Sequence, residues 1–233
     1  VRGCLLASLC LFCVLVGAWT GFTVYDHFFA HYWFSANGGA YVNVVPTEPA
    51  TGYADAGKIV FTDESKVDVR RALGYRDRLT YCVAPISDGT LSTSVQFWAT
   101  GMECCSARGS FTCDDTFNTK ARSGFVIRDV SEHRRDQHYY YMKAVRQAEA
   151  AFGITSTDPI FVRWVKDPEK METNYWRTGF GVLLVSVIVA LLFCIFVISL
   201  IFSSWLGYRW WTVGRKAFGE RFQAPVLPDP PVP

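Results

Sequence analysis

The chain has 233 residues, half of them hydrophobic, and 23 Lys and Arg stand against 21 Asp and Glu, for a formal net charge of +2. This balance, with no basic stripe, excludes nucleic acid as a partner. Two runs, Cys4–Val24 and Gly179–Leu206, contain no charged residue and no His. Each is long enough to cross ~30 Å of hydrocarbon as a helix. The lack of an ionisable residue inside either run argues against a transporter or pump acting alone.

These runs predict four parts: a transmembrane helix at 3–24, a disulfide-tied luminal domain at 25–176, a second transmembrane helix at 177–207, and a cytosolic or stromal tail at 208–233. The tail is basic at first and then rich in Pro. Arg2 and Val16-Gly17-Ala18 also resemble a signal peptide with its cleavage site. The first run is longer than the signal core of about 7–15 residues, which favours a retained anchor.

Flanking charge predicts the orientation. Arg2 precedes the first run. Four basic residues follow the second run: Arg209, Arg215, Lys216 and Arg221. Positive flanks stay on the side where the protein is made. We therefore expect both termini in the cytosol or stroma and the central domain in a lumen or outside the cell.

Small side chains form a stripe along each predicted membrane helix. They are Gly3, Ala7, Cys10, Gly17 and Gly21 in the first, and Ser186, Ala190 and Cys194 in the second. Small residues let membrane helices approach closely. The two stripes either face each other within the monomer or dock a helix of another subunit.

An aromatic belt, Tyr25–Phe34, follows the first run, as is typical of a membrane–water boundary. His27 and His31 are four residues apart and share one helical face there. The simpler interpretation is a pair of interfacial histidines. The sharper one is a ligand for chlorophyll, with carotenoid or lipid as other molecules at this surface. No motif requires a cofactor.

The central segment predicts an α+β domain, mainly an antiparallel sheet with one packed helix. A helix is expected at Glu132–Phe152, with Ser131 and Gly153 as its caps. Val67–Leu73 is expected to be a short helix. Alternating apolar runs predict strands at Tyr41–Val45, Lys58–Thr62, Leu79–Val83, Ser92–Thr100, Gly124–Val130 and Pro159–Val165.

Four of the eight cysteines, Cys82, Cys104, Cys105 and Cys113, lie in this domain. In an oxidising compartment they predict two disulfides. Adjacent cysteines rarely bond to each other, which leaves two connectivities: 82–104 with 105–113, or 82–105 with 104–113. A zinc site is disfavoured because the Cys104-Cys105 pair lacks the usual spacing between ligands.

Catalytic signatures are missing from the sequence. There is no GxSxG, no P-loop, no HExxH and no GxGxxG. We therefore predict no catalytic residue, no metal ligand and no enzymatic activity. A thiol redox enzyme that uses Cys104-Cys105 is the remote alternative.

The segment QFWATGMECCSARGSFTCDD at Gln96–Asp115, with YCVAPI at Tyr81–Ile86 and ARSGFVI at Ala121–Ile127, resembles an uncharacterised group of dinoflagellate membrane proteins. These share an FWA.G..CC..RG.F.CDD core between two membrane spans. The resemblance carries no established activity. The lineage it implies makes a plastid photosystem–antenna complex in the thylakoid membrane the expected setting.

The function expected from these features is a non-catalytic accessory subunit of a large membrane complex. Its partners would be other membrane subunits, bound through the helices and the luminal domain, and membrane lipid. An auxiliary subunit of an ion channel or a cell-surface receptor has the same topology and is the alternative.

Overall fold

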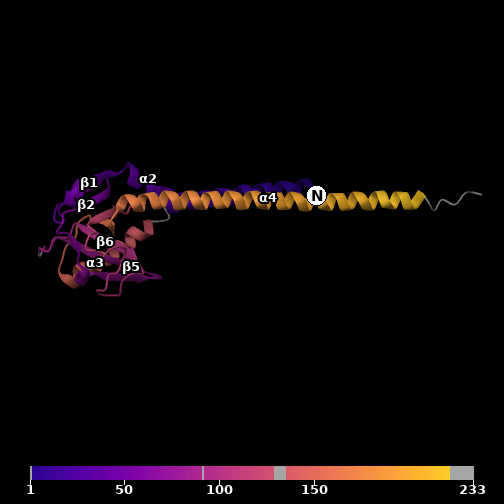
Figure 1. The fold of residues 1–233 in the computed structure, drawn as a ribbon. Coiled ribbons are helices and arrows are strands. Elements are labelled where there is room, and N and C mark those ends of the chain that lie inside the picture. Colours follow the sequence, from indigo (N-terminus) through magenta and orange to yellow (C-terminus); the bar gives the residue numbers. More distant parts are fainter. Residues whose placement is uncertain (1, 91, 129–134, 221–233) are drawn as a thin grey trace, which may run out of the picture. The chain divides into compact units, whose positions relative to one another are not determined.

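A computed structural model describes the backbone of residues 2–90, 92–128 and 135–220, and the side chains of 7–90, 92–128 and 137–203. The chain divides into two units, Val1–Leu183 and Leu184–Pro233. The first holds the N-terminal helix, the whole sheet and the start of the C-terminal helix (Figure 1). The Pro-rich end of the tail, Ser131 and His133 lie outside the described residues.

The N-terminal helix runs without a break from α1 (Arg2–Val24) through a π-helical turn, η1 (Tyr25–Phe29), into α2 (Ala30–Asn37). The predicted boundary at residue 24 therefore falls inside a helix. The helix ends where the amide of Gly38 donates to Phe34 O at 2.9 Å. A Cβ on Gly38 would lie 2.7 Å from the backbone of Gly57, so this close approach between α2 and the sheet requires glycine.

The sheet has the strand order β1-β2-β7-β8-β6-β5-β3, with β4 paired to β5 outside this path. Of the seven pairs described, β1–β2 and β6–β8 are parallel and the other five are antiparallel. The predicted fold class is confirmed at this level: a mixed sheet lies between two long apolar helices. The strands are β1 (Gly39–Val44), β2 (Ala56–Phe61), β3 (Lys66–Val67), β4 (Leu73–Asp77), β5 (Leu79–Ser87), β6 (Phe97–Met102), β7 (Ser123–Val126) and β8 (Ile160–Val165).

Two local predictions are wrong. Val67–Leu73 is not a helix: β3 is followed by a single 3-10 turn, η3 (Val69–Arg71), and then by β4. Ser92–Thr100 is a strand only from Phe97 onward. The preceding residues bond instead to the segment before β8, where Val95 N donates to Thr155 O at 2.8 Å.

Both faces of the sheet are buried. On one face, α3 (Arg135–Phe152) packs its Tyr141, Val145 and Ala148 against Val83 and Trp98. On the other face, a second cluster of buried residues includes Phe61, Phe97, Phe111, Cys82 and Trp164. The buried residues form two clusters, one on each face, because neighbouring residues of a strand point to opposite faces of the sheet.

The C-terminal helix, α4 (Pro168–Glu220), begins three residues after β8 and nine before the predicted start at 177. Asp167 caps it, because its Oδ1 accepts from the amide of Lys170 at 3.0 Å. The apolar side chains between Phe180 and Phe202 are mostly exposed. Among the described residues, Ala7–Asn37 and Pro168–Ser203 are long and apolar enough to cross a membrane.

Candidate functional site

A row of three side chains crosses the sheet and receives the start of α4. Lys58 on β2 is paired with Phe125 on β7, and Phe125 with Arg163 on β8, so all three point to one face. We call Lys58, Phe125 and Arg163 the cross-sheet row. Each member contacts the first two turns of α4.

The contacts of the cross-sheet row differ in kind. The Nζ of Lys58 lies 2.9 Å from a carboxylate oxygen of Glu172. The ring of Phe125 stacks on Tyr175 with centroids 5.6 Å apart, and Arg163 Nη1 donates to the Tyr175 hydroxyl at 3.4 Å. Residues 172 and 175 are three apart and therefore share one helical face. The row thus fixes both the position and the rotation of the first two turns of α4 on the sheet.

The N-terminal helix holds α4 from a second direction. Ser35 Oγ donates to Glu172 Oε2 at 2.7 Å, and the Trp176 ring contacts Phe29 and Tyr32 with centroids 5.3 and 5.1 Å away. A Cβ on Gly179 would lie 2.8 Å from Phe28 Cβ. The aromatic belt predicted for a membrane boundary is therefore also where the two helices pack together.

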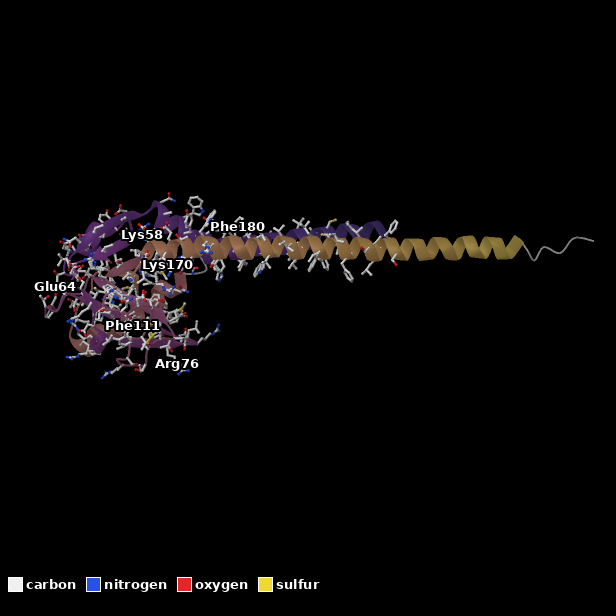
Figure 2. All side chains as sticks on the ribbon, viewed as in Figure 1. Lys58, Glu64, Arg76, Phe111, Lys170 and Phe180 are labelled. Carbon is white, nitrogen blue, oxygen red and sulfur yellow. A yellow bond between two sulfur atoms is a disulfide. The ribbon has the colours of Figure 1, made fainter. Side chains whose placement is uncertain are left out.

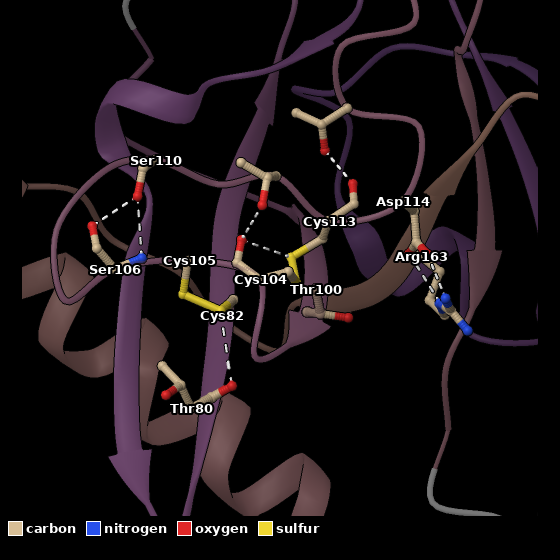
Figure 3. Close-up of a disulfide and its surroundings, with 12 residues drawn as sticks. Thr80, Cys82, Thr100, Cys104, Cys105, Ser106, Ser110, Cys113, Asp114 and Arg163 are labelled. Carbon is tan, nitrogen blue, oxygen red and sulfur yellow. Dashed lines mark hydrogen bonds and ion pairs between the residues drawn. A yellow bond between two sulfur atoms is a disulfide. The ribbon is translucent and has the colours of Figure 1, made fainter.

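Arg163 is also bound from residues 103–122 between β6 and β7, which we call the cysteine loop. Its Nε donates to Asp114 at 2.9 Å, and Nη2 forms an ion pair with the same carboxylate (Figure 3). Burial acts to lower the pKa of Arg163, but the hydrogen bonds and charge of Asp114 outweigh burial and raise it. Arg163 is therefore a permanent cation, and its two-pronged bond to Asp114 fixes the loop on β8.

Two disulfides hold the cysteine loop. They join Cys82 to Cys105 and Cys104 to Cys113, which is one of the two connectivities left open by the sequence (Figure 3). Glycines make room for them. A Cβ on Gly74 would lie 2.8 Å from Cys105 Sγ, and one on Gly101 would lie 2.5 Å from Cys113 Sγ.

A cavity of about 690 Å³ lies beside the ion pair between Arg163 and Asp114. Its wall is built from the N-terminal helix, β6, the cysteine loop, β7, β8, α3 and α4. Volumes of this size are ordinary for sites that bind small molecules. The side chains that give it chemical character are Asp26, His27, His31, Asp114, Tyr141, Arg163 and Tyr175, with the Cys104–Cys113 disulfide.

The two histidines singled out from the sequence both line this cavity but differ in exposure. His31 is buried and its ring lies 5.2 Å from that of Tyr175. His27 is exposed, and its Nδ1 lies 3.0 Å from Thr23 O. A carbonyl only accepts, so this contact requires the hydrogen on Nδ1, and in the neutral ring the lone pair then lies on Nε2. Such a backbone bond is also what orients a histidine that binds a metal. Of the two, His27 has the geometry of a ligand.

The cavity holds a buried phenol as well. Burial raises the pKa of Tyr141, against the opposing charge of Arg163, so the phenol stays neutral. A π-helical turn carries Asp26 and His27, and such turns occur often at functional sites. These groups can bind a polar or aromatic molecule through hydrogen bonds and ring contacts.

Metal-binding groups are few in the part of the chain that the structure describes. There, the grouped metal-ligand atoms are the sulfurs of Cys82, Cys104 and Cys113, which lie within 4.8 Å of one another. All three are in disulfides and offer no thiolate.

The predicted helix-packing residues lie in two units. Ala7, Cys10, Gly17 and Gly21 are on α1, and Ser186, Ala190 and Cys194 are on the part of α4 beyond Leu183; the surroundings of residue 3 lie outside the described side chains. Within the first unit, a Cβ on Gly17 or Gly21 meets nothing within 4 Å. This stripe is therefore open to a helix from outside the unit.

No protein-family model, curated protein or solved structure matches this chain. The resemblance to dinoflagellate membrane proteins therefore stays a prediction, and the function is argued from the structure alone.

No motif in the sequence identified the residues that seat α4 or line the cavity beside it: Lys58, Asp114, Arg163, Glu172 and Tyr175. One signal was available. Lys58 and Arg163 each stand near the middle of an apolar strand, and a cation there needs an acidic or aromatic partner. The partner could not be identified, because Glu172 is more than a hundred residues from Lys58 along the chain.

Proposed function

We propose that this chain is a non-catalytic accessory subunit of a larger membrane assembly, and that it holds its domain at a fixed position above the membrane. The observation that carries the proposal is the rigid seating of the domain. Only Gly38 separates α2 from β1, and only Lys166 and Asp167 separate β8 from α4. With the cross-sheet row and the aromatic contacts, the end of α2 and the start of α4 are packed directly on the sheet within the first unit. A fixed domain suits a subunit that must present one surface to fixed neighbours.

Membrane insertion is supported by the two apolar helices. Their exposed side chains include Trp19, Phe22, Leu192 and Ile198. Soluble proteins seldom expose apolar surface on this scale. Lipid and the helices of partner subunits would cover it. With the basic residues after the second run on the cytosolic or stromal side, the disulfide-tied domain faces a lumen or the outside.

Disulfides support the non-catalytic assignment over the thiol redox alternative. Cys105 is bonded to Cys82 on β5, and Cys104 is bonded to Cys113 within the cysteine loop. This gives the vicinal pair a structural role. The alternative of a channel or receptor subunit shares the topology and would be revealed by its partners.

A role in light harvesting depends on the resemblance and on His27. The free Nε2 of His27 could bind the central metal of a chlorophyll-type ring at the helix surface. A His27→Ala variant that loses pigment, beside a His138→Ala control that keeps it, would support this assignment.

The proposal is tested by purifying the full chain from its native membrane in mild detergent and identifying what comes with it by mass spectrometry. We expect several other membrane polypeptides. Gly17→Leu with Gly21→Leu should lose them, because added bulk keeps a partner helix away. The control, Ala18→Leu with Phe22→Leu, alters the neighbouring face at the same spacing and should retain them.

The outcomes separate the candidates. Photosystem or antenna polypeptides with pigment would place the subunit in a plastid complex, whereas a channel or receptor subunit would favour the alternative. A protein that is integral to the membrane but purifies alone, in both variants and the parent, would overturn the proposal.

A further inference from the structure

A second hollow lies at the base of α4, in the first unit. Its volume is about 620 Å³. Three cations line it: Lys166 just before the helix, and Lys170 and Arg177 on it. We call it the basic hollow. Lys170, Asn174 and Arg177 are spaced four and three residues apart, so they lie along one face of α4. Figure 2 shows Lys170 near the start of the helix, with Phe180 farther along it.

The cations of the basic hollow have no acidic partner. Within the described part of the chain, no ion pair or hydrogen bond joins the side chains of Lys166, Lys170 or Arg177 to another residue. The two carboxylates of the hollow bind backbone instead. Asp115 Oδ2 accepts from the amide of Lys166 at 2.8 Å, and Asp167 caps α4 through Lys170 N. The amides at the start of the helix are thus partly satisfied, and the free donors are the three cationic side chains.

Amides extend the donor set. Asn118 of the cysteine-loop side and Asn174 of α4 line the same hollow. Three cations against two carboxylates leave the hollow with a net positive charge. Together with the neutral amide donors, this favours an oxyanion with several oxygen atoms, such as a phosphate.

The place of the basic hollow on α4 selects the source of the phosphate. Arg177 stands two residues before Gly179, where the apolar run begins, and Lys170 stands nine residues before it. At 1.5 Å per residue, these residues lie about 3 Å and 13 Å ahead of the apolar run. The headgroup layer on each side of a bilayer is about 5–8 Å deep. Arg177 therefore lies within the headgroup layer. The backbone of Lys170 lies about 5–8 Å beyond this layer on the domain side, close enough for its long side chain to reach back toward the phosphates.

We propose that the basic hollow binds the phosphate headgroup of an anionic phospholipid in the leaflet on the domain side. The acyl chains of this lipid would lie against the apolar run, where Phe180 and Val182 are exposed. This inference rests on the membrane insertion proposed above. It adds a specific lipid contact that fixes the depth of α4 in the bilayer and supports the domain from below.

The test uses the full chain in nanodiscs of phosphatidylcholine with one lipid in five replaced by phosphatidylglycerol. Native mass spectrometry then counts the phosphatidylglycerol retained by the released protein. We expect the parent chain to retain it in preference to phosphatidylcholine. A cation near a membrane surface contributes about fivefold in binding, so Arg177→Gln and Lys170→Gln should each reduce the preference about fivefold.

The matched control is Arg76→Gln. Arg76 is exposed on β4, outside the basic hollow, and its loss changes the net charge equally (Figure 2). It should leave the preference unchanged. An equal loss in this control would mean that net charge attracts the lipid, and would overturn the inference. Equal melting temperatures of all variants show that they are folded.

Three further outcomes discriminate between these explanations. If inorganic phosphate added at millimolar concentration abolishes the preference, the hollow is a site for the free anion and the lipid assignment is wrong. If the chain inserts into nanodiscs but shows no headgroup preference, this inference fails while the proposed function stands. If it does not insert at all, both fail.

Discussion

The domain is fixed at two places by different means. On one side, two disulfides tie the cysteine loop to β5 and to itself. On the other side, α4 is seated by an ion pair, ring contacts and a hydrogen bond, with no covalent bond. The first region cannot separate without a reductant, whereas the second can open whenever thermal motion overcomes its contacts.

The two regions are linked through one residue pair. Asp114 follows Cys113 directly, and it binds Arg163 of the cross-sheet row. The covalent region thus places a carboxylate where the non-covalent region needs it, and Arg163 in turn positions Tyr175. A lesion in the disulfide region should therefore disturb the seating of α4, but a lesion in the seating should leave the disulfides intact.

The largest effect is expected from Gly101→Ala. The added Cβ would lie 2.5 Å from Cys113 Sγ and 2.6 Å from Cys104 Sγ, so the loop could not close as it does. Overpacking and the loss of the disulfide should together lower the free energy of unfolding by about 3 kcal/mol. Thermal unfolding of the full chain in detergent, followed by circular dichroism, measures the change.

Gly52→Ala is the control for Gly101→Ala, since a Cβ on Gly52 meets nothing within 4 Å. Its free energy of unfolding should lie within about 0.5 kcal/mol of that of the parent chain. Equal stability of the two variants would show that the disulfides do not pack against β6 as described here.

Local patterns were enough to predict much of the sheet. The apolar run before Lys166 and the alternation around Lys58 correspond to β8 and β2 within one or two residues. The prediction of a helix at Val67–Leu73 was wrong, because β3 and β4 pair with opposite ends of the long β5 and not with each other. That arrangement depends on contacts distant in sequence, which a periodicity argument cannot detect.

The candidate site was only half predictable. His27 and His31 were found from their four-residue spacing, and the domain cysteines from their compartment. The choice between two disulfide connectivities needed the positions of Gly74 on β4 and Gly101 on β6, the two strands that flank β5. The seating of α4 could not be predicted, because the second membrane helix was expected to begin at 177, whereas its first turns, from Pro168, pack on the sheet.

An intermediate effect is expected where the two helices pack together. Gly179→Ala would place a Cβ 2.8 Å from Phe28 Cβ, whereas Gly181→Ala meets nothing. Alanine favours a helix over glycine by up to about 1 kcal/mol, so Gly181→Ala should stabilise the chain slightly. In Gly179→Ala, overpacking should outweigh this gain and lower the free energy of unfolding by about 2 kcal/mol.

The same unfolding measurement compares the two variants, with limited proteolysis near Lys166 and Asp167 as a second readout. Gly179→Ala should be cleaved faster there, because α4 separates from the sheet more often. If both variants are equally stable and equally resistant, the contact between the N-terminal helix and α4 is absent in solution.

The smallest effect concerns the ion pair that anchors one end of the cross-sheet row. The side chains of Lys58 and Glu172 are only 18% and 17% exposed, and Glu172 also accepts from Ser35. A double-mutant cycle with Lys58→Gln and Glu172→Gln should give a coupling free energy of about 1 kcal/mol.

The pair Arg122–Asp63 is the control, because its side chains are 45% and 85% exposed. Solvent screens exposed pairs, so the cycle with Arg122→Gln and Asp63→Asn should give a coupling within about 0.3 kcal/mol of zero. Equal couplings for the two pairs would mean that α4 leaves the sheet often enough for water to reach Lys58, and the seating would then be looser than the contacts of Phe125 and Arg163 imply.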